Sequence, residues 1–232
     1  GPMDLVYYGE SIDEYPTVNG LVAYGKENNE EENDYSDIIE LCRVIDGTDY
    51  DSPEAFAEAL EEVFNVDSYL RYMAVTALTM NWDTYPNTGN NFYLFHDPIT
   101  DRFEWIPWDL TWGGETRMPL FTRGEFLVSP YAPLFERVLE VERYRRQYAA
   151  YLDLLMRFAF NYETINSQAQ TYHNMIAPYV HQASGDLMYY NETGWFTPDE
   201  FNNSWQELAL LAHERNQFVR KVLIQEGYLP AA

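Results

Sequence analysis

The sequence has 232 residues, 46% of them hydrophobic and 17% aromatic. That is enough apolar surface for one sizeable core and too much for a disordered chain. Its 38 acidic residues outnumber 14 Lys and Arg, which gives a formal net charge of -24. A surface this negative attracts cations and repels phosphate backbones and anionic lipid, so binding to nucleic acids or membrane surfaces is disfavoured. No apolar run reaches the ~20 residues that a membrane-spanning helix needs.

The chain has a single cysteine, Cys42, which excludes a framework of internal disulfides. It lies in the apolar run 38–45, so we expect it to be buried rather than reactive. The four histidines form no HExxH pattern, and a zinc site has little support. Gly1 and Pro2, which precede Met3, look like the remnant of a cleaved fusion tag.

The first half of the chain predicts loops followed by helices. Residues 4–33 indicate loop and short strand, and their acidic run 27–34 is typical of a solvated loop. Apolar residues at 38, 41, 42 and 45 have the spacing of one buried helix face, which predicts a helix over 36–45. Ser52 and Pro53 begin a helix that reaches Phe64, and we expect Asp67 to cap a buried helix over 68–80.

A β-hairpin is predicted in the middle of the chain. Residues 81–91 are too rich in Asn, Pro and Gly for a helix and indicate a polar loop. The strands 92–95 and 103–106 follow, joined by a turn over 96–102. The remainder is expected to be helical over 131–139, 142–160, 162–181 and 198–225. We see no internal repeat and no interdomain linker, so the fold class is a mostly helical α+β domain with one hairpin.

Three polar residues stand out by their placement around this hairpin. Asp83 lies in the loop after the buried helix, Asn91 precedes the first strand, and Asp109 follows the second. The start of one hairpin strand lies beside the end of the other, so we expect Asn91 and Asp109 to meet at one end, with Asp83 nearby. Carboxylate and amide oxygens in a loop-lined edge suit Mg²⁺, which keeps waters for a phosphate substrate.

This order matches the logic of a kinase active site. There a catalytic-loop Asp orients the acceptor hydroxyl, a following Asn binds metal, and a second Asp after a hairpin holds the metal that bridges the phosphates. The interval from Asp83 to Asn91 is 8 residues and that from Asn91 to Asp109 is 18. Both are looser than in the HRDxxxxN and DFG signatures of kinases, and both signatures are absent. Asp and Asn are also common as turn and cap residues, so the spacing leaves a structural role open.

Other side chains have competing interpretations. Most of the hairpin aromatics are expected in the core, whereas Trp108 and Trp112 flank Asp109 and would shape the site. Arg117 and Arg123 lie where an activation segment would be, but balancing surface acid is the commoner role. The remaining candidates have ordinary explanations: Asp34 and Asp37 as helix caps rather than a cation site, and Arg143, Arg145 and Arg146 as a solvated face paired with Glu140 and Glu142.

Several segments closely resemble the spore coat protein H (CotH) kinase family. The most specific are Asn81-Trp82-Asp83, the block from Gly89 to Asp97, and the block from Phe103 to Gly113, which contains Ile106-Pro107-Trp108-Asp109. The segments 35–41 and 66–72 are similar too, and the resemblance extends over nearly the whole chain from about Asp4. Where the family often has His-Asn before the strand, this chain has Asn90-Asn91.

The resemblance implies an atypical protein kinase that transfers phosphate from ATP to Ser or Thr of a protein. It implies Asp83 as the catalytic-loop residue, with Asn91 and Asp109 holding Mg²⁺ or Mn²⁺ and, through the metal, the nucleotide. The protein substrate would be a coat or surface-assembly protein, and the resemblance favours a spore coat or a secreted, cell-surface location.

The front of the chain departs from that family. Of the N-terminal lobe that grips the nucleotide, only the last stretch, 4–26, resembles this chain. We therefore expect residues 3–35 to end or link that lobe and 36–232 to form the C-terminal catalytic lobe. The chain has two lysines, Lys26 and Lys221, both expected at the surface, and no glycine-rich phosphate loop. Two other functions therefore remain open: a non-catalytic metal-binding or scaffolding module of a spore coat or cellulosome, and metal-assisted hydrolysis.

Overall fold

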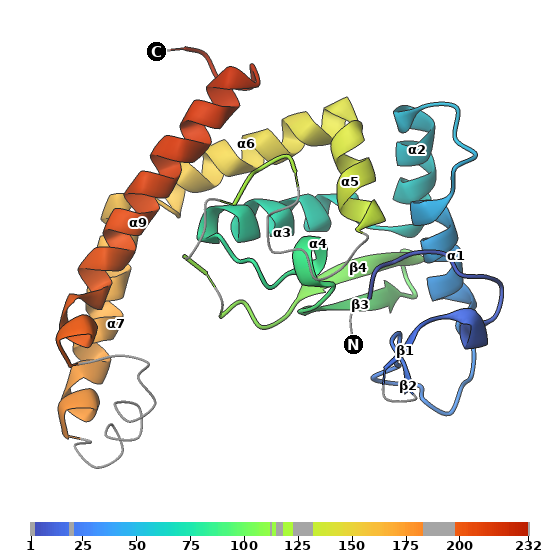
Figure 1. Ribbon diagram of the computed structural model, residues 1–232, viewed down its shortest axis with the longest axis horizontal. Coiled ribbons are helices and arrows are strands. Elements are labelled where there is room, and N and C mark those ends of the chain that lie inside the picture. The colour runs from blue at the N-terminus through green and yellow to red at the C-terminus, as the bar shows by residue number, and fades with distance from the viewer. Residues whose placement is uncertain are drawn as a thin grey trace. The chain divides into compact units, whose positions relative to one another are not determined.

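The structure is a computed structural model that describes residues 3–18, 21–111, 113–114, 118–122, 132–182 and 198–231. These residues are mostly helical, with two small antiparallel sheets of two strands each (Figure 1), which confirms the expected α+β class. The chain divides into two compact units, Gly1–Tyr151 and Leu152–Ala232, and the division falls inside a helix rather than in an extended linker.

The helices and strands follow the predicted order. The first unit contains η1 (Ile12–Glu14), β1 (Thr17–Val18), β2 (Leu21–Val22), α1 (Ser36–Asp46), α2 (Pro53–Val63), α3 (Val66–Thr79), α4 (Tyr85–Thr88), β3 (Phe92–Asp97), β4 (Arg102–Pro107), α5 (Pro133–Glu140) and the first part of α6 (Glu142–Phe158). The second contains the rest of α6, α7 (Tyr162–Gln182) and α9 (Pro198–Gln225). The helix predictions were correct to within three residues at either end.

Two local predictions were wrong. The loop over 81–91 contains one helical turn, α4, because Pro86 occupies the second helical position, where its missing N–H costs nothing. Asn65, not Asp67, caps α3: its side-chain oxygen accepts the N–H of Ser68 at 3.2 Å. Asp67 lies in the first turn and instead accepts from Gln147 and Tyr151 on α6.

An aromatic core joins α3, α4 and the hairpin. Trp105 on β4 stacks on Phe92 of β3 with ring centroids 4.1 Å apart, and its ring lies 4.8 Å from Tyr69 and 5.5 Å from Tyr85. All four side chains are buried. Offset and edge-on packing of this kind adds to the burial of apolar area, so the hairpin is held firmly against α3. Cys42 on α1 is also buried, as predicted, and burial raises the pKa of its thiol.

The hairpin buries one face and exposes the other. Phe92 pairs with Pro107, and Leu94 with Trp105, so that Phe92 and Trp105 point into the core. The alternate residues Tyr93, Phe95 and Ile106 are exposed, although most of the hairpin aromatics had been expected in the core. Large apolar side chains occupy both faces of β3, so the sequence of this strand by itself does not indicate which face is buried.

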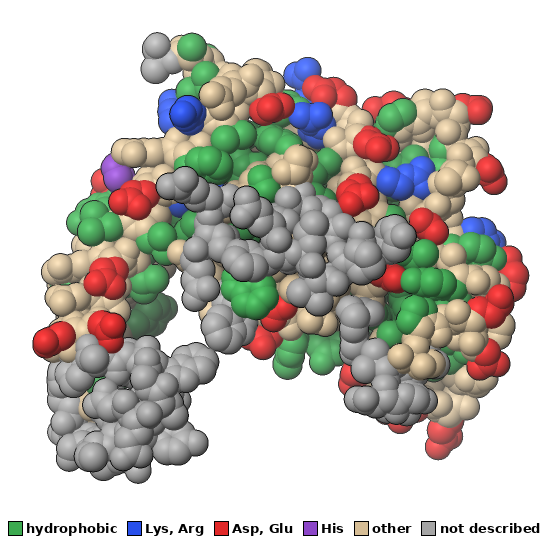
Figure 2. Space-filling model, viewed as in Figure 1, with side chains coloured by type: hydrophobic (Ala, Val, Ile, Leu, Met, Phe, Trp, Pro, Cys, Tyr) green, Lys and Arg blue, Asp and Glu red, His purple; other side chains and the backbone are tan. Residues whose placement is uncertain are grey.

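Acidic side chains are scattered over the face drawn in Figure 2, with fewer Lys and Arg side chains among them, in keeping with the net charge of the chain. Arg146 pairs with Glu142 at 2.9 Å, as predicted. Arg143 does not pair with Glu140 but bridges Glu54 and Glu61 of α2, so it joins α6 to that helix. In the second unit, α7 and α9 lie side by side, and Asn216 of α9 donates to the backbone oxygen of Phe160 at 2.5 Å.

Candidate functional site

The candidate site begins where α3 ends. Met80 follows the helix with φ 54°, a left-handed conformation that turns the chain sharply out of the helix axis. The next residues form a tight turn that carries Asp83 and continues into α4. The Asp83 side chain is half-buried, so its carboxylate remains accessible while its backbone is held in the turn.

Asn91 contacts Asp83 directly. Its side-chain nitrogen Nδ2 donates to the backbone oxygen of Asp83 at 2.7 Å and to the carboxylate oxygen Oδ2 at 2.9 Å. Asn91 itself has φ 63°, in the left-handed region that asparagine tolerates better than most residues. The residue before β3 is therefore bent toward the turn after α3, and Asn91 and Asp83 form one unit.

Asp109 lies at the same end of the hairpin. The N–H of Trp108 donates to the backbone oxygen of Asn91 at 3.0 Å. Asp109 is the next residue after Trp108, so its backbone lies close to that of Asn91. Asp109 also has a left-handed backbone, with φ 40°, and is exposed. Among the described residues its carboxylate accepts a hydrogen bond from Thr111 at 2.6 Å and none from Asp83 or Asn91. Asn91 is thus joined to Asp83 through its side chain and to the residue before Asp109 through its backbone.

The donor set suits a hard cation. Two carboxylates and an amide oxygen are the ligand types that Mg²⁺ and Mn²⁺ take. Because Nδ2 of Asn91 is engaged by Asp83, the amide oxygen is the atom left to face a cation. No group of three or more His, Cys, Asp or Glu side chains close enough to share a metal occurs in the described part of the chain. A cation here would therefore depend on the amide and on ligands from outside the chain, such as water or phosphate.

Sequence reasoning missed two features that hold the site together. The side-chain oxygen of Asn81 accepts the N–H of Asp83 at 3.1 Å, and Asn87 donates to the backbone oxygen of Trp82 at 3.1 Å. The segment after Asp109 returns to the end of α3, where the N–H of Gly114 donates to the oxygen of Thr79 at 3.0 Å. The Asn-x-Asp spacing is a recognisable signal for an Asx turn, whereas the bond of Gly114 depends on tertiary structure.

The other sequence candidates lie apart from this unit. Lys26 donates to the backbone oxygen of Glu32 at 2.8 Å and lies over the Tyr35 ring, so it is a surface residue, as expected. Asp34 and Asp37 accept the N–H groups of Ser36 and Ile38 at the start of α1, but neither occupies the N-cap position, which is Tyr35 and has no side-chain capping bond. Trp108 is exposed beside Tyr93, with ring centroids 5.4 Å apart. Trp112, Arg117 and Arg123 lie outside the described residues.

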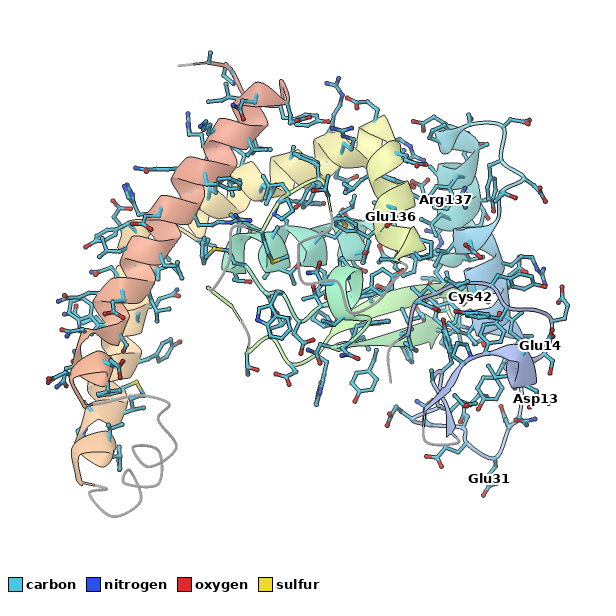
Figure 3. All side chains as sticks on the ribbon, viewed as in Figure 1. Asp13, Glu14, Glu31, Cys42, Glu136 and Arg137 are labelled. Carbon is cyan, nitrogen blue, oxygen red and sulfur yellow. The ribbon has the colours of Figure 1, made fainter. Side chains whose placement is uncertain are left out.

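A cleft of about 400 Å³ lies elsewhere in the first unit, between the end of α1 and the start of α5. Arg137, labelled on α5 in Figure 3, lines it but is occupied: it donates to the backbone oxygens of Ile45 and Gly47 and lies over the Phe56 ring at 4.0 Å. The arginine thus satisfies carbonyls at the C-terminus of α1. The cleft is rimmed by Asp46, Glu136 and Glu140, and the hairpin residues are not among its walls.

The described part of the chain includes no helix with the length and apolar character needed to cross a membrane. This agrees with the sequence-based expectation.

Comparison with known proteins gives one family match. The family described as CotH kinase protein matches residues 8–219. The chain is 26% identical over 164 residues to the inner spore coat protein H of Bacillus subtilis. This alignment covers 68% of the chain and 42% of the Bacillus protein. The chain is 24% identical over 226 residues to Invasin CotH2 of Rhizopus delemar, covering 89% of this chain and 36% of the invasin. For Invasin CotH3 of the same fungus the identity is 25% over 221 residues, covering 88% and 35%. The chain spans well under half the length of these relatives.

Proposed function

Because the chain belongs to the CotH kinase protein family, we propose that it carries the catalytic lobe of an atypical protein kinase, which transfers phosphate from ATP to Ser or Thr of a protein. The observation that supports this most directly is the hydrogen-bonded pair of Asp83 and Asn91, with Asp109 one residue beyond the backbone bond between Trp108 and Asn91. In this proposal the general base and the two metal ligands come from the same end of one hairpin, which is the kind of arrangement that phosphoryl transfer uses.

Each residue has a distinct part in this proposal. Asp83 would accept the proton of the attacking hydroxyl and hold that hydroxyl in line with the phosphate. Asn91 and Asp109 would hold Mg²⁺ or Mn²⁺, which when bound neutralises charge on the phosphates. Asn91 would also fix the direction of the Asp83 carboxylate through its Nδ2 bond. Positioning and charge neutralisation account for most of the catalysis in such reactions.

The backbone at the site is left-handed at several positions, as it also is at Leu5, Asn29 and Asp101 elsewhere in the described residues. Asn91 and Asp109 both have positive φ, and non-glycine residues in this region cost free energy that is usually tolerated where function requires it. Met80, which opens the Asp83 turn, is a third such residue. Left-handed residues therefore occur at the start of all three segments that carry the proposed machinery. In the proposal, the cationic clamp on the phosphates comes from outside this site.

Metal binding is the first test. We would titrate Mg²⁺ and Mn²⁺ by calorimetry, with and without ATP, into the wild type and into Asp109→Asn. The matched control is Asp101→Asn, which removes an exposed carboxylate with a left-handed backbone from the other end of the same hairpin. We expect Asp109→Asn to weaken Mn²⁺ binding by about tenfold or more, the effect of losing a charged ligand, while Asp101→Asn leaves it unchanged. Equal effects of the two substitutions would contradict the site.

Phosphate transfer is the second test. The chain is incubated with ATP, Mn²⁺ and a protein acceptor. We expect mass spectrometry to find phosphate on Ser or Thr of that acceptor, and to find none when the chain carries Asp83→Asn. Phosphate released into solution with no protein acceptor would indicate metal-assisted hydrolysis instead.

A second function is supported by what the relatives are called. Their names describe a spore coat protein and two invasins rather than enzymes. In the alternative proposal the chain is a non-catalytic metal-binding or scaffolding module of a surface assembly, such as a spore coat or a cellulosome. Metal binding that requires Asp109, combined with no phosphate transfer by a longer form of the protein, would favour this alternative over the kinase.

A further inference from the structure

The turn that carries Asp83 contains an unusual share of the buried polar side chains. Six polar or charged side chains are buried in the described part of the chain, and four of them, Asn81, Thr84, Asn87 and Thr88, fall within eight residues around Asp83. Burying polar groups costs free energy unless hydrogen bonds compensate for the lost water. Thr84, Asn87 and Thr88 each donate to a backbone oxygen within this segment, so these side chains help to fix the conformation of the turn.

Asn81 is the buried polar residue that contacts Asp83. Its side-chain oxygen accepts the N–H of Asp83 at 3.1 Å, and its own N–H donates to the backbone oxygen of Thr76 at 3.0 Å, which ties the turn to the last part of α3. On the other side of Asp83, the backbone oxygen accepts from Asn91. Both backbone polar groups of Asp83 are thus held by asparagine side chains.

The nitrogen of the Asn81 side chain has no such function. Nδ2 is buried, and among the described residues it has no hydrogen-bond partner. Asn81 as a whole is 1% exposed. An unpaired buried donor is unfavourable, so the favourable contact of this side chain is made by its oxygen and not by its nitrogen.

We propose that Asn81 is a positioning residue, which holds the Asp83 peptide through its side-chain oxygen and thereby aims the Asp83 carboxylate at Asn91. The inference about geometry stands on the hydrogen bonds alone, and its consequence for metal binding rests on the proposed function. Serine can replace asparagine in this role, since a hydroxyl oxygen forms the same kind of turn with the N–H two residues on. Alanine cannot.

The experiment compares Asn81→Ala with Asn81→Ser. Asn161→Ala serves as the matched control, because the Asn161 side-chain oxygen accepts the N–H of Thr164 at 2.9 Å in the second unit, so that this variant loses an equivalent bond. Two signals are read by NMR with ¹⁵N labelling: hydrogen exchange of the Asp83 backbone amide, and the position of the Asn91 side-chain NH₂ resonances. Mn²⁺ affinity is measured on the same samples.

In Asn81→Ala we expect the Asp83 amide to exchange about tenfold faster, which corresponds to the loss of one hydrogen bond, and the Asn91 NH₂ resonances to move. In Asn81→Ser and Asn161→Ala both signals should stay as in the wild type. Mn²⁺ affinity should fall in Asn81→Ala and be retained in Asn81→Ser.

The inference is overturned if Asn81→Ala leaves both NMR signals unchanged, or if Asn81→Ser behaves like Asn81→Ala, since the volume of the side chain and not its oxygen would then matter. If Asn81→Ala does not fold, the two NMR signals of Asn81→Ser decide the role of Asn81 by themselves. A wild type that binds no Mn²⁺ would contradict the proposed function, while the two NMR signals would still decide the role of Asn81.

Discussion

The side-chain nitrogen of Asn91 bonds both the backbone oxygen and the carboxylate of Asp83, at 2.7 and 2.9 Å. Two requirements meet in this residue: an amide donor in reach of Asp83, and a backbone at φ 63°. Glycine meets the second requirement alone, and most other residues meet neither. Asparagine meets both, which is a physical reason for its presence before β3.

Substitutions at Asn91 should separate these two requirements. Asn91→Gly removes the amide and keeps the left-handed backbone, whereas Asn91→Ala removes the amide and adds strain. We expect both to weaken Mn²⁺ binding by about tenfold, and Asn91→Ala to lower the free energy of unfolding by about 1 kcal/mol more than Asn91→Gly does. Calorimetry and urea unfolding would measure the two effects. Wild-type affinity in Asn91→Gly would show that the amide is not a ligand.

Two buried tyrosines should respond differently to loss of the hydroxyl group. The hydroxyl of Tyr85 donates to the backbone oxygen of Asp4 at 2.9 Å and accepts the N–H of Leu134 at 3.3 Å, so it links the N-terminal segment, α4 and α5. Tyr85→Phe leaves both groups unpaired and should lower the free energy of unfolding by about 1–3 kcal/mol. The Tyr69 hydroxyl is buried and has no hydrogen-bond partner among the described residues.

Tyr69→Phe is therefore the control for Tyr85→Phe. It should be neutral or stabilising, because it removes a buried polar group that makes no hydrogen bond. Urea unfolding of the two single variants would compare them directly. A larger loss of stability in Tyr69→Phe than in Tyr85→Phe would contradict the argument that the Tyr85 hydroxyl stabilises the fold by hydrogen bonding and the Tyr69 hydroxyl does not.

Arg137 should stabilise the fold through its geometry as much as through its charge. Its guanidinium donates to the backbone oxygens of Ile45 and Gly47 and lies 4.0 Å from the centroid of Phe56. We expect Arg137→Ala to lower the free energy of unfolding by about 2–3 kcal/mol, since the carbonyls lose their partner and the ring loses its cation. Arg137→Lys should recover only part of this stability, because an ammonium group lacks the planar, two-pronged donor geometry of the guanidinium. Full recovery with lysine would contradict the argument.

The sequence was most informative where local chemistry decides the structure. The helix over 198–225 and the start of α2 at Ser52 and Pro53 were predicted correctly, because periodic apolar residues and capping residues act within a few positions. The meeting of Asn91 with the segment before Asp109 also follows from strand pairing, which places the two ends of a hairpin together.

What the sequence did not predict depends on tertiary packing. Asn65 and Asp67 are both residue types that cap helices well. The choice between them depends on α6, because its Tyr151 and Gln147 donate hydrogen bonds to the Asp67 carboxylate. Within β3, Tyr93 and Phe95 have the same apolar character as Phe92, so the buried face of this strand is decided by its packing with Trp105 of β4. The division of the chain inside α6 gives no sequence signal, because the helix continues through it.

The bridge from Glu61 to α6 should make stability depend on pH. Partial burial favours protonation of this carboxyl, but hydrogen bonds from Arg143 and Tyr144 outweigh it, so the pKa of Glu61 is lowered. A carboxyl whose pKa is lower in the folded state stabilises the protein above its unfolded pKa of about 4.3, and this contribution is lost as the pH falls through the folded pKa. With the Glu61 side chain 41% exposed, screening by solvent limits the contribution to about 0.5–1 kcal/mol.

We expect Glu61→Gln to be less stable than the wild type by this amount at pH 7 and equally stable at the acid end, as measured by urea unfolding between pH 3 and 7. Glu58→Gln, an exposed glutamate on the same helix, should show no such convergence, and a difference for Glu61→Gln that grows toward low pH would contradict the sign of the shift.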